Sequence, residues 1–529
     1  MINRRQFLMI TGAGAVDVFT GGMTSLLNVP YTAAKANTAS EFIPDLDIDL
    51  TATPAEVSLF PGNPTGVWSF RGQVLKGGRS SLINLERSYL GPIIRVNRGQ
   101  KIRIRFTNDI PDETIVHWHG LHVPAVMDGH PRYVIPQGET YIYEFEVLNR
   151  AGTYWYHPHP HGRTGPQVYG GLAGLFIVSD KEEKAAGLPS GEYDIPLVIQ
   201  DRAFDNDNQL VYMSGHMMER MNGFLGNWIL VNGHPDFILT VATRAYRLRL
   251  LNGSNSRIYK LAWQDGSPLT VIGTDGGLLE KPVYRRYVML GPAERIELWA
   301  DFSSKPVGSE TALVSLPFDT GMMGGGMMGG RRMGRDMMGR GMMGGGMMGY
   351  AQTLPNGAGF PIFRVRVNSS EKAVQYLPKR LSTIGAYIPK DAVNLRYPRT
   401  FGLFMQHMTW TINGRIFRME EVANDERVRM DTLEVWEFIN EGGGMRMMGM
   451  MNMPHPIHLH GKQFQVLERR GVTHNGYVDE GWKDTVLLMP GERIRILVGF
   501  DDYPGLFLYH CHNLEHEDMG MMRNYFVKP

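Results

Sequence analysis

Apolar and polar residues alternate over short stretches near both ends of the chain. Residues 141–145 read Tyr-Ile-Tyr-Glu-Phe, and residues 493–496 read Arg-Ile-Arg-Ile. Longer alternating stretches cover residues 96–108 and 428–440, and both end in asparagine. A period of two, bounded by Gly, Pro and Asn, predicts half-buried β-strands.

The first and last thirds of the chain repeat the same order of features. Gly138 precedes His157 by nineteen residues, and Gly491 precedes His510 by the same nineteen. In both copies an alternating run is followed by a glycine and then by a mostly aromatic and aliphatic run that ends at the histidine. The two thirds are therefore expected to share one supersecondary plan.

A middle copy of the alternating pattern lies at residues 241–252 and 294–298, without a histidine motif. Three copies predict an all-β chain of three Greek-key β-sandwich domains. We place these domains at residues 42–180, 190–368 and 380–529. The stretch 371–399 lacks clean alternation, which is typical of a linker.

The composition is that of a globular protein with ample apolar core. The 529 residues are 43% hydrophobic and 20% charged, with a formal net charge of +1. No basic segment dominates, so nucleic acid is not an expected partner.

The N-terminus carries paired arginines, Arg4 and Arg5, ahead of a Gly-rich, moderately apolar stretch and an Ala-Lys-Ala cleavage pattern at residues 34–36. Residues 1–36 resemble a twin-arginine export signal, which places the mature protein in the periplasm or otherwise outside the cytoplasmic membrane. The alternative is a cytosolic tail with a chance Arg-Arg pair, and Asp17 within the apolar stretch favours it. No other segment is long and apolar enough to suggest a membrane span.

The only cysteine of the chain, Cys511, lies between two histidines. A lone cysteine cannot form an internal disulfide, and a thiolate beside imidazoles is a soft ligand that indicates copper. His516 and Met521 follow it closely, and two imidazoles, a thiolate and a weak axial thioether form a blue-copper site. His510 and His512 point to the opposite face of an extended chain, so they are expected to bind a different metal.

Three further histidine clusters accompany the cysteine segment: His-Trp-His at 117–119, His-Pro-His at 157–159 and His-Pro-Ile-His-Leu-His at 455–460. Together with that segment they contain ten of the seventeen histidines. Four motifs in this order resemble the multicopper oxidase family across nearly the whole chain. The resemblance implies cupredoxin-like domains and four copper ions: one type 1, one type 2 and a type 3 pair. An isolated motif of this kind would be better explained by ordinary core or surface histidines.

The family pattern implies a role for each ligand position. It gives type 1 copper to His455, Cys511, His516 and Met521; type 2 copper to His117 and His458; and the type 3 pair to His119, His157, His159, His460, His510 and His512. Because the type 2 and type 3 ligands come from the first and last thirds, the cluster is expected at the interface of domains one and three.

Two acids match family positions that relay protons to the cluster: Asp128, nine residues after His119, and Glu517, directly after His516. Carboxylates near bound oxygen suit a reaction that consumes four protons per O2. The alternative is that each acid only orients a histidine through a hydrogen bond. The segment 482–485, Trp-Lys-Asp-Thr, resembles a family segment close to the coppers and is interpreted as structural support.

Methionine and glycine make up almost all of residues 321–349, which also hold four arginines and one acid, Asp336. A second Met/Gly cluster, residues 442–453, leads directly into His455. Thioethers favour Cu(I), so these segments are interpreted as collecting or shielding substrate copper; the alternative is a low-complexity loop without function. They resemble the methionine-rich inserts of the bacterial copper-efflux branch, the cuprous oxidases. Asp336, Met451 and Met453 are the candidate substrate-copper ligands, although that branch has an aspartate where this chain has Met451.

The resemblance implies one-electron oxidation of a reductant at type 1 copper, electron transfer through Cys511 to His510 and His512, and reduction of O2 to two waters. The favoured reductant is Cu(I), with Fe(II) as a second metal, in copper tolerance. The alternative is a laccase-like oxidase of phenols and aromatic amines. A copper-storing scaffold without catalysis would be expected to lack some ligands of the copper cluster. A copper nitrite reductase is disfavoured, because it would have no use for the full set of trinuclear ligands. A monomer is expected.

Overall fold

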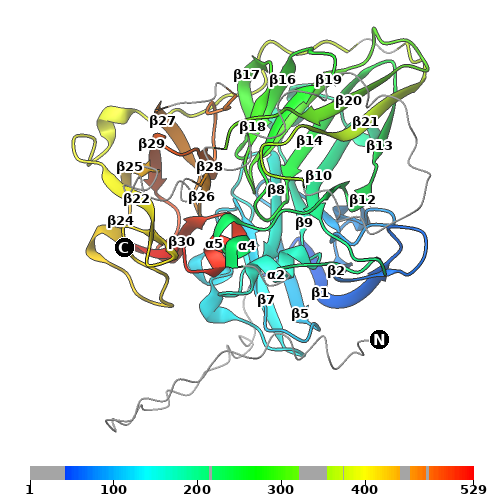
Figure 1. Cartoon of the computed structure of the whole chain (residues 1–529). Helices are drawn as coiled ribbons and strands as arrows, with labels where there is room; N and C mark the ends of the chain where they lie inside the picture. The colour runs from blue at the N-terminus through cyan, green and yellow to red at the C-terminus, as the bar shows by residue number, and fades with distance from the viewer. Residues whose placement is uncertain (1–41, 214–216, 321–353, 373–374, 441–452, 472–475) are drawn as a thin grey trace. The chain divides into compact units, whose positions relative to one another are not determined.

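The computed structural model describes residues 42–213, 217–320, 354–372, 375–440, 453–471 and 476–529. These residues form three consecutive groups of strands, and each group makes two sheets around one apolar core (Figure 1). The fold is all-β with cupredoxin-like sandwiches, as expected.

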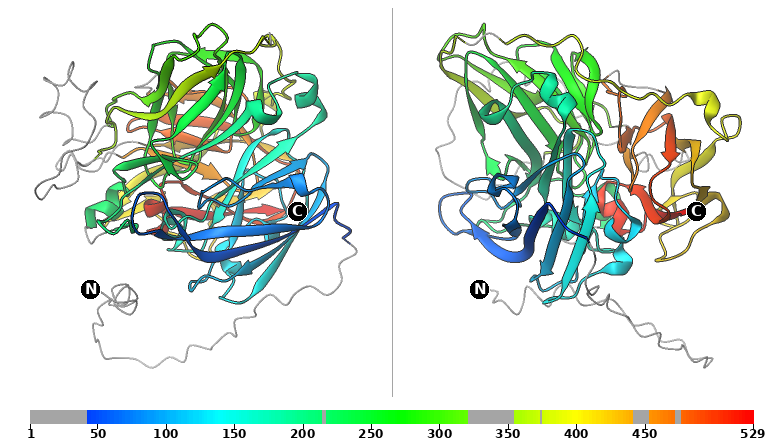
Figure 2. Two further views of the ribbon diagram at one scale, coloured as in Figure 1. Left: turned by 90° about the vertical axis from the view of Figure 1, so that its right-hand side faces the viewer. Right: turned by 180° about the vertical axis from the view of Figure 1, so that it is seen from behind.

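The first sandwich pairs a sheet of order β2-β1-β5-β7 with a sheet of order β3-β4-β9-β8-β6. Its strands are β1 (Leu46–Val57), β2 (Thr65–Lys76), β3 (Leu82–Ile83), β4 (Ile93–Asn97), β5 (Lys101–Asn108), β6 (Val116–His119), β7 (Thr140–Glu146), β8 (Gly152–Pro158) and β9 (Gly174–Ser179). The long β1 and β2 are antiparallel neighbours (blue in Figure 2). Inward residues of both sheets, such as Ile94 and Ile104, share one buried cluster.

The second sandwich has sheets of order β12-β11-β10-β14-β19-β16-β17 and β13-β21-β20-β15-β18. Its strands are β10 (Asp194–Arg202), β11 (Trp228–Val231), β12 (His234–Pro235), β13 (Ile238–Ala242), β14 (Ala245–Asn252), β15 (Tyr259–Trp263), β16 (Leu269–Thr274), β17 (Gly277–Arg285), β18 (Val288–Leu290), β19 (Arg295–Asp301), β20 (Glu310–Ser315) and β21 (Phe360–Ser369).

The third sandwich has sheets of order β23-β22-β25-β29-β27 and β24-β31-β30-β26-β28. Its strands are β22 (Arg399–Gln406), β23 (Thr409–Ile412), β24 (Arg427–Arg429), β25 (Thr432–Ile439), β26 (His455–Leu459), β27 (Phe464–Arg470), β28 (Thr485–Leu488), β29 (Arg493–Phe500), β30 (Gly505–Cys511) and β31 (Met522–Lys528). The described residues between β21 and β22 form only the short 3-10 helix η5.

Helices are few and short in the described residues, and none is long and apolar enough to cross a membrane. They are α2 (Thr164–Tyr169), α3 (Lys181–Ala185), α4 (Met217–Asn222), α5 (Leu514–Asp518), η1 (Arg79–Ser81), η2 (Ala125–Met127), η3 (Pro131–Tyr133), η4 (Gly191–Tyr193), η5 (Pro389–Asp391) and η6 (Asn424–Glu426). Helix α5 contacts both α2 and α4, and the three are drawn close together in Figure 1.

The long alternating stretches of the sequence are each two strands rather than one. Residues 96–108 contain the end of β4 and all of β5, with a turn at Gly99 (φ 83°) between them. Residues 428–440 divide between β24 and β25 at Asp431 (φ 56°). In each case the chain crosses from one sheet of the sandwich to the other. The alternation continues because both sheets face the same core.

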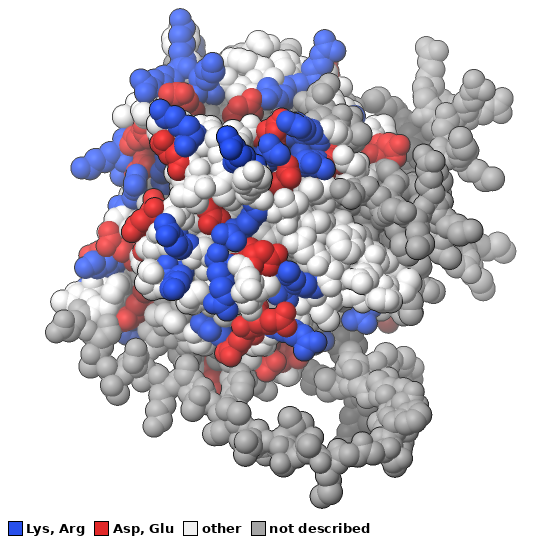
Figure 3. All heavy atoms as spheres, turned by 90° about the vertical axis from the view of Figure 1, so that its left-hand side faces the viewer, with Lys and Arg blue, Asp and Glu red and all other residues white. Residues whose placement is uncertain are grey.

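Charged side chains of both signs are interspersed on the face drawn in Figure 3. This agrees with the net charge of +1.

Candidate metal centre

Paired strands position the histidines. In the first sandwich β6 and β8 are antiparallel, and His117 lies opposite His157. In the third, β26 and β30 are antiparallel, and His458 lies opposite His510. Residues two apart on a strand share a face, so each strand pair presents several imidazoles on one surface.

Eight histidines from these strands and their ends gather into one buried group. Nε2 of His117 lies 3.3 Å from Nε2 of His458, and Nε2 of His510 lies 3.0 Å from that of His460 and 3.3 Å from that of His159. Each side chain is at most 1% exposed. We call this set the eight-histidine group: His117, His119, His157, His159, His458, His460, His510 and His512.

Carbonyl oxygens hold the outer nitrogens of two of these rings. Nδ1 of His117 lies 2.6 Å from the carbonyl oxygen of Asp128, and Nδ1 of His458 lies 2.8 Å from that of Asp484. A carbonyl only accepts, so both Nδ1 atoms carry the proton and both Nε2 atoms keep a free lone pair.

Two lone pairs facing each other at 3.3 Å repel unless a cation lies between them. Protonation of a ring does not relieve this, because burial lowers the pKa of His117 and of His458 well below the ordinary value. Burial also lowers the pKa of His157 to about 4 and that of His159 to about 3. Neutral imidazoles with converging lone pairs fit metal ions.

A second group surrounds Cys511. Its Sγ lies 3.4 Å from Nδ1 of His455 and 3.7 Å from Nδ1 of His516, and all three residues are fully buried. Met521 is buried in the same apolar cluster, and its carbonyl oxygen accepts the Cys511 backbone N–H at 3.1 Å. Burial raises the pKa of the Cys511 thiol, so a bound cation is needed to hold it as a thiolate. The donor set of two imidazoles, one thiolate and one thioether suits copper.

The outer edge of this second group is closed by a segment that the sequence did not single out. Nε2 of His516 and Nε1 of Trp410 both donate to the carbonyl oxygen of Met221, on α4, at 2.8 Å. The Trp410 ring lies 4.7 Å from that of His455 and 4.9 Å from that of His516. No local motif marks Met221 or Trp410, because both act from distant parts of the chain.

The two acids that match proton-relay positions contact the eight-histidine group. Oδ2 of Asp128 lies 2.8 Å from Nδ1 of His460, and Oε2 of Glu517 lies 3.1 Å from Nδ1 of His510. Burial raises the pKa of Asp128 well above its ordinary range. Burial would also raise the pKa of Glu517, but His159 and His510 outweigh it and lower that pKa to about 2.

Of the candidate substrate-copper ligands, Asp336 and Met451 lie outside the described residues. Met453 is 2% exposed and packs in the core of the third sandwich, where Asn440 donates to its carbonyl oxygen at 2.8 Å. Its role as a substrate-copper ligand stays a prediction.

Comparisons with known proteins decide the family. Multicopper oxidase family models match residues 70–183 and 392–529. A laccase of Bacillus stratosphericus is 31% identical over 520 residues, covering 87% of this chain and 90% of that protein. The chain belongs to the multicopper oxidase family.

Solved structures agree with this assignment. The multicopper oxidase McoA of Aquifex aeolicus is 33% identical with a TM-score of 0.75, covering 92% of this chain and 97% of that one. A Campylobacter jejuni multicopper oxidase described as a metallo-oxidase is 27% identical with a TM-score of 0.69, covering 91% of each chain. This multicopper oxidase is thus a copper-dependent oxidoreductase that uses O2 as its electron acceptor.

Proposed function

We propose that this multicopper oxidase oxidises a reduced metal ion, Cu(I) and also Fe(II), and serves copper tolerance. Bound copper supplies one-electron transfer from the reductant and four-electron reduction of O2 to water. The chain's own part is to hold the ions, to exclude bulk water and to deliver protons.

The proposed ligand roles follow the two groups. His455, Cys511 and His516, with Met521 as axial ligand, hold type 1 copper. His117 and His458 hold type 2 copper. Within the eight-histidine group, His159, His460 and His510 form one type 3 set, and His119, His157 and His512 form the other. The convergence of His159 and His460 on His510 supports the first set, and the 3.4 Å between Nδ1 of His119 and Nε2 of His157 supports the second.

The closed outer edge of the Cys511 group is the observation that favours a metal ion over a phenol as the reductant. His455 and His516 are fully buried, and the outward nitrogen of His516 is already bonded to Met221. A phenol therefore cannot hydrogen-bond to that nitrogen directly. A metal ion needs no such contact, because soft thioethers near the site can bind it and pass an electron inward.

Methionines close to this edge in the sequence support the proposal. The second Met/Gly cluster, residues 442–453, runs directly into His455, and the longer one occupies residues 321–349. We propose that both segments collect or shield Cu(I), as in the copper-efflux branch. A relative of similar fold, from Campylobacter jejuni, is described as a metallo-oxidase.

Asp128 and Glu517 are proposed to supply protons at the eight-histidine group. Each acid contacts Nδ1 of a histidine, so each also fixes that ring. Their pKa values are moved in opposite directions, which suits one group that holds a proton and one that remains a carboxylate.

Export through the twin-arginine pathway to the periplasm is proposed from the arginine pair and the cleavage pattern of residues 1–36. A laccase-like activity on phenols and aromatic amines is the competing function, and the similarity to a Bacillus stratosphericus laccase favours it.

Steady-state O2 consumption by the copper-loaded enzyme tests the choice, with Cu(I), Fe(II) and a phenol supplied separately. We expect a higher kcat/KM for Cu(I) than for the phenol. Cys511→Ser is the control and abolishes uptake with every donor, because the electron-entry ligand is lost. A higher kcat/KM for the phenol would assign the protein to the laccase function.

A further inference from the structure

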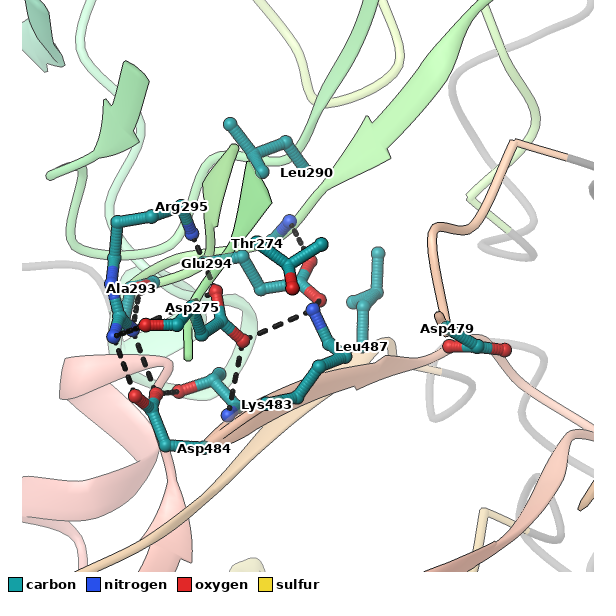
Figure 4. Close-up of polar contacts among 12 residues, drawn as sticks. Thr274, Asp275, Leu290, Ala293, Glu294, Arg295, Asp479, Lys483, Asp484 and Leu487 are labelled. Carbon is teal, nitrogen blue, oxygen red and sulfur yellow. Dashed lines mark hydrogen bonds and ion pairs between the residues drawn. The ribbon is translucent and has the colours of Figure 1, made fainter. Parts of the chain in front are cut away.

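The second sandwich supplies none of the proposed type 1, type 2 or type 3 ligands, yet one of its side chains contacts an acid that binds the eight-histidine group. Arg295 is the first residue of β19 and is completely buried. Its guanidinium makes a two-point ion pair with Asp484, with Nη1 2.7 Å from Oδ1. Figure 4 shows this pair together with Asp275 and Ala293.

Arg295 joins elements of all three sandwiches. Nε donates to the carbonyl oxygen of Thr153 on β8 at 2.9 Å, and Nη2 donates to that of Asp275 at 3.0 Å. Strand β8 carries His157, whereas Asp484 directly precedes β28 of the third sandwich. A planar guanidinium with five donors can hold several acceptors in a fixed geometry, which an ammonium cannot reproduce.

Asp484 in turn holds two histidines of the group. Its Oδ1 lies 3.1 Å from Nε2 of His119, and its carbonyl oxygen accepts from Nδ1 of His458 at 2.8 Å. His119 thus keeps its proton on Nε2 and presents Nδ1 to the metal side, opposite to His117 and His458. The tautomer of His119 depends on the position of the Asp484 carboxylate.

The pair is pressed directly against the His-Trp-His segment. Gly120, with φ +85°, follows His119, and a Cβ at this position would collide with Oδ2 of Asp484 and Nη2 of Arg295. The absence of a side chain lets the ion pair approach the backbone next to a ligand.

A second set of buried charges holds the backbone of Arg295 and the residue before Asp484. Lys483 Nζ lies 3.0 Å from Asp275 Oδ2 and 3.2 Å from Glu294 Oε1, and Asp275 Oδ1 accepts the Arg295 backbone N–H at 2.7 Å. The charges alternate along a chain of contacts, so each buried ion has a partner of opposite sign (Figure 4).

We propose that Arg295 is a positioning residue for the trinuclear copper cluster. By fixing Asp484 it sets the ring orientation and tautomer of His119, and through the Asp484 backbone it fixes His458. The second sandwich thereby controls the geometry of type 2 and type 3 ligands that belong to the other two. This inference rests on the proposed type 2 and type 3 roles of the eight histidines.

The test compares copper-loaded wild type with Arg295→Lys and Arg295→Met. Copper content, the visible band of the thiolate-bound copper, the type 2 electron paramagnetic resonance signal and the near-ultraviolet absorption of the coupled pair are measured. We expect both variants to keep the visible band, which reports the Cys511 group. The type 2 signal should change, and the near-ultraviolet absorption should weaken, more in Arg295→Met than in Arg295→Lys.

Arg469→Met is the matched control. The Arg469 side chain is 6% exposed and pairs with Asp479 and Glu492, and its partners among the described residues include neither Asp484 nor any histidine of the group. The Arg469→Met substitution should lower thermal stability and leave all copper signals unchanged. A double variant, Arg295→Met with Asp484→Asn, also removes the carboxylate that Arg295→Met alone leaves buried without a cation. Folding should then recover while the type 2 signal stays altered, which separates a folding defect from lost ligand orientation.

The outcomes separate the positioning role of Arg295 from the proposed type 2 and type 3 roles of the histidines. Wild-type protein without type 2 and type 3 signals would overturn the proposed roles of the eight histidines. With those signals present, unchanged spectra in both Arg295 variants would overturn the positioning role. Loss of the visible band in Arg295→Lys along with the cluster signals would also overturn it, because the effect would then be general unfolding.

Discussion

At the scale of single residues, the centre depends on which nitrogen of each ring carries its proton. Carbonyl oxygens of Asp128, Asp484 and Met221 accept hydrogen bonds from ring nitrogens of His117, His458 and His516. These acceptors lie outside the metal-binding motifs. The ligands can be selected from the sequence, but their tautomers are set by contacts that only the fold creates.

Replacing the thiolate separates the two metal groups. In Cys511→Ser the visible charge-transfer band should disappear, because a hydroxyl does not replace the soft thiolate. Up to three coppers should remain, since the Cys511 side chain lies with His455 and His516 and supplies no ligand to the eight-histidine group. Copper content and visible spectra check this, and loss of all copper would show that the groups are not independent sites.

At the scale of elements, the sequence predicts the histidine motifs well but not where one strand ends and the next begins. The histidines of β6, β8, β26 and β30 could be selected because each lies in a local motif of a few residues. The break at Gly99 could not be predicted from alternation, because β4 and β5 lie in different sheets but face the same core.

Contacts between distant elements carry no local signal at all. Arg295 and Asp484 are 189 positions apart, and His516 and Met221 are 295 apart. Both pairs form only after the sandwiches assemble. An arginine opening an alternating strand resembles any other charged residue until its partner is known, which is why the sequence did not identify it.

Deletion of residues 321–349 tests the proposed role of the longer Met/Gly segment. Turnover with Cu(I) should fall, because soft ligands for the incoming ion are removed, while phenol oxidation should hold or rise. Stability should change little, since ordering a Gly-rich segment costs conformational entropy that offsets what burial of its methionines could contribute. Paired kinetics with both donors provide the measurement. An equal fall with both donors would indicate a folding defect, and no change with either would leave the segment without a role in turnover.

At the scale of the whole molecule, the eight-histidine group depends on the junction of the first and third sandwiches, because each contributes four of its ligands. One ion-pair cluster at this junction contains none of the proposed metal ligands. Asp502, which follows β29, accepts from Nδ1 of His122 at 2.6 Å and pairs with the buried Lys462. The junction therefore has its own dependence on pH, separate from that of the copper ligands.

The sign of that dependence follows from the pKa of Asp502. Burial would raise this pKa, but the hydrogen bond and charge of His122, together with Lys462, outweigh it and lower the pKa from 3.8 to about 2. A carboxyl with a depressed folded-state pKa stabilises the protein above the unfolded-state pKa. The contribution is lost as the pH falls through the folded-state value. Its full size is about 2 kcal/mol.

Asp502→Asn should lower the free energy of unfolding at neutral pH by about 3 kcal/mol, because it leaves the Lys462 ammonium buried beside an amide. The difference from wild type should shrink by about 1 kcal/mol between pH ~5 and pH ~3, since the wild-type carboxylate by then has lost about half of its contribution. Denaturant unfolding across this range measures it. Asp501→Asn is the control, because the Asp501 side chain is 68% exposed and lies 3.8 Å from Lys462, so its effect should stay below about 1 kcal/mol. A difference for Asp502→Asn that does not vary with pH would show that protonation of this carboxyl does not govern the junction.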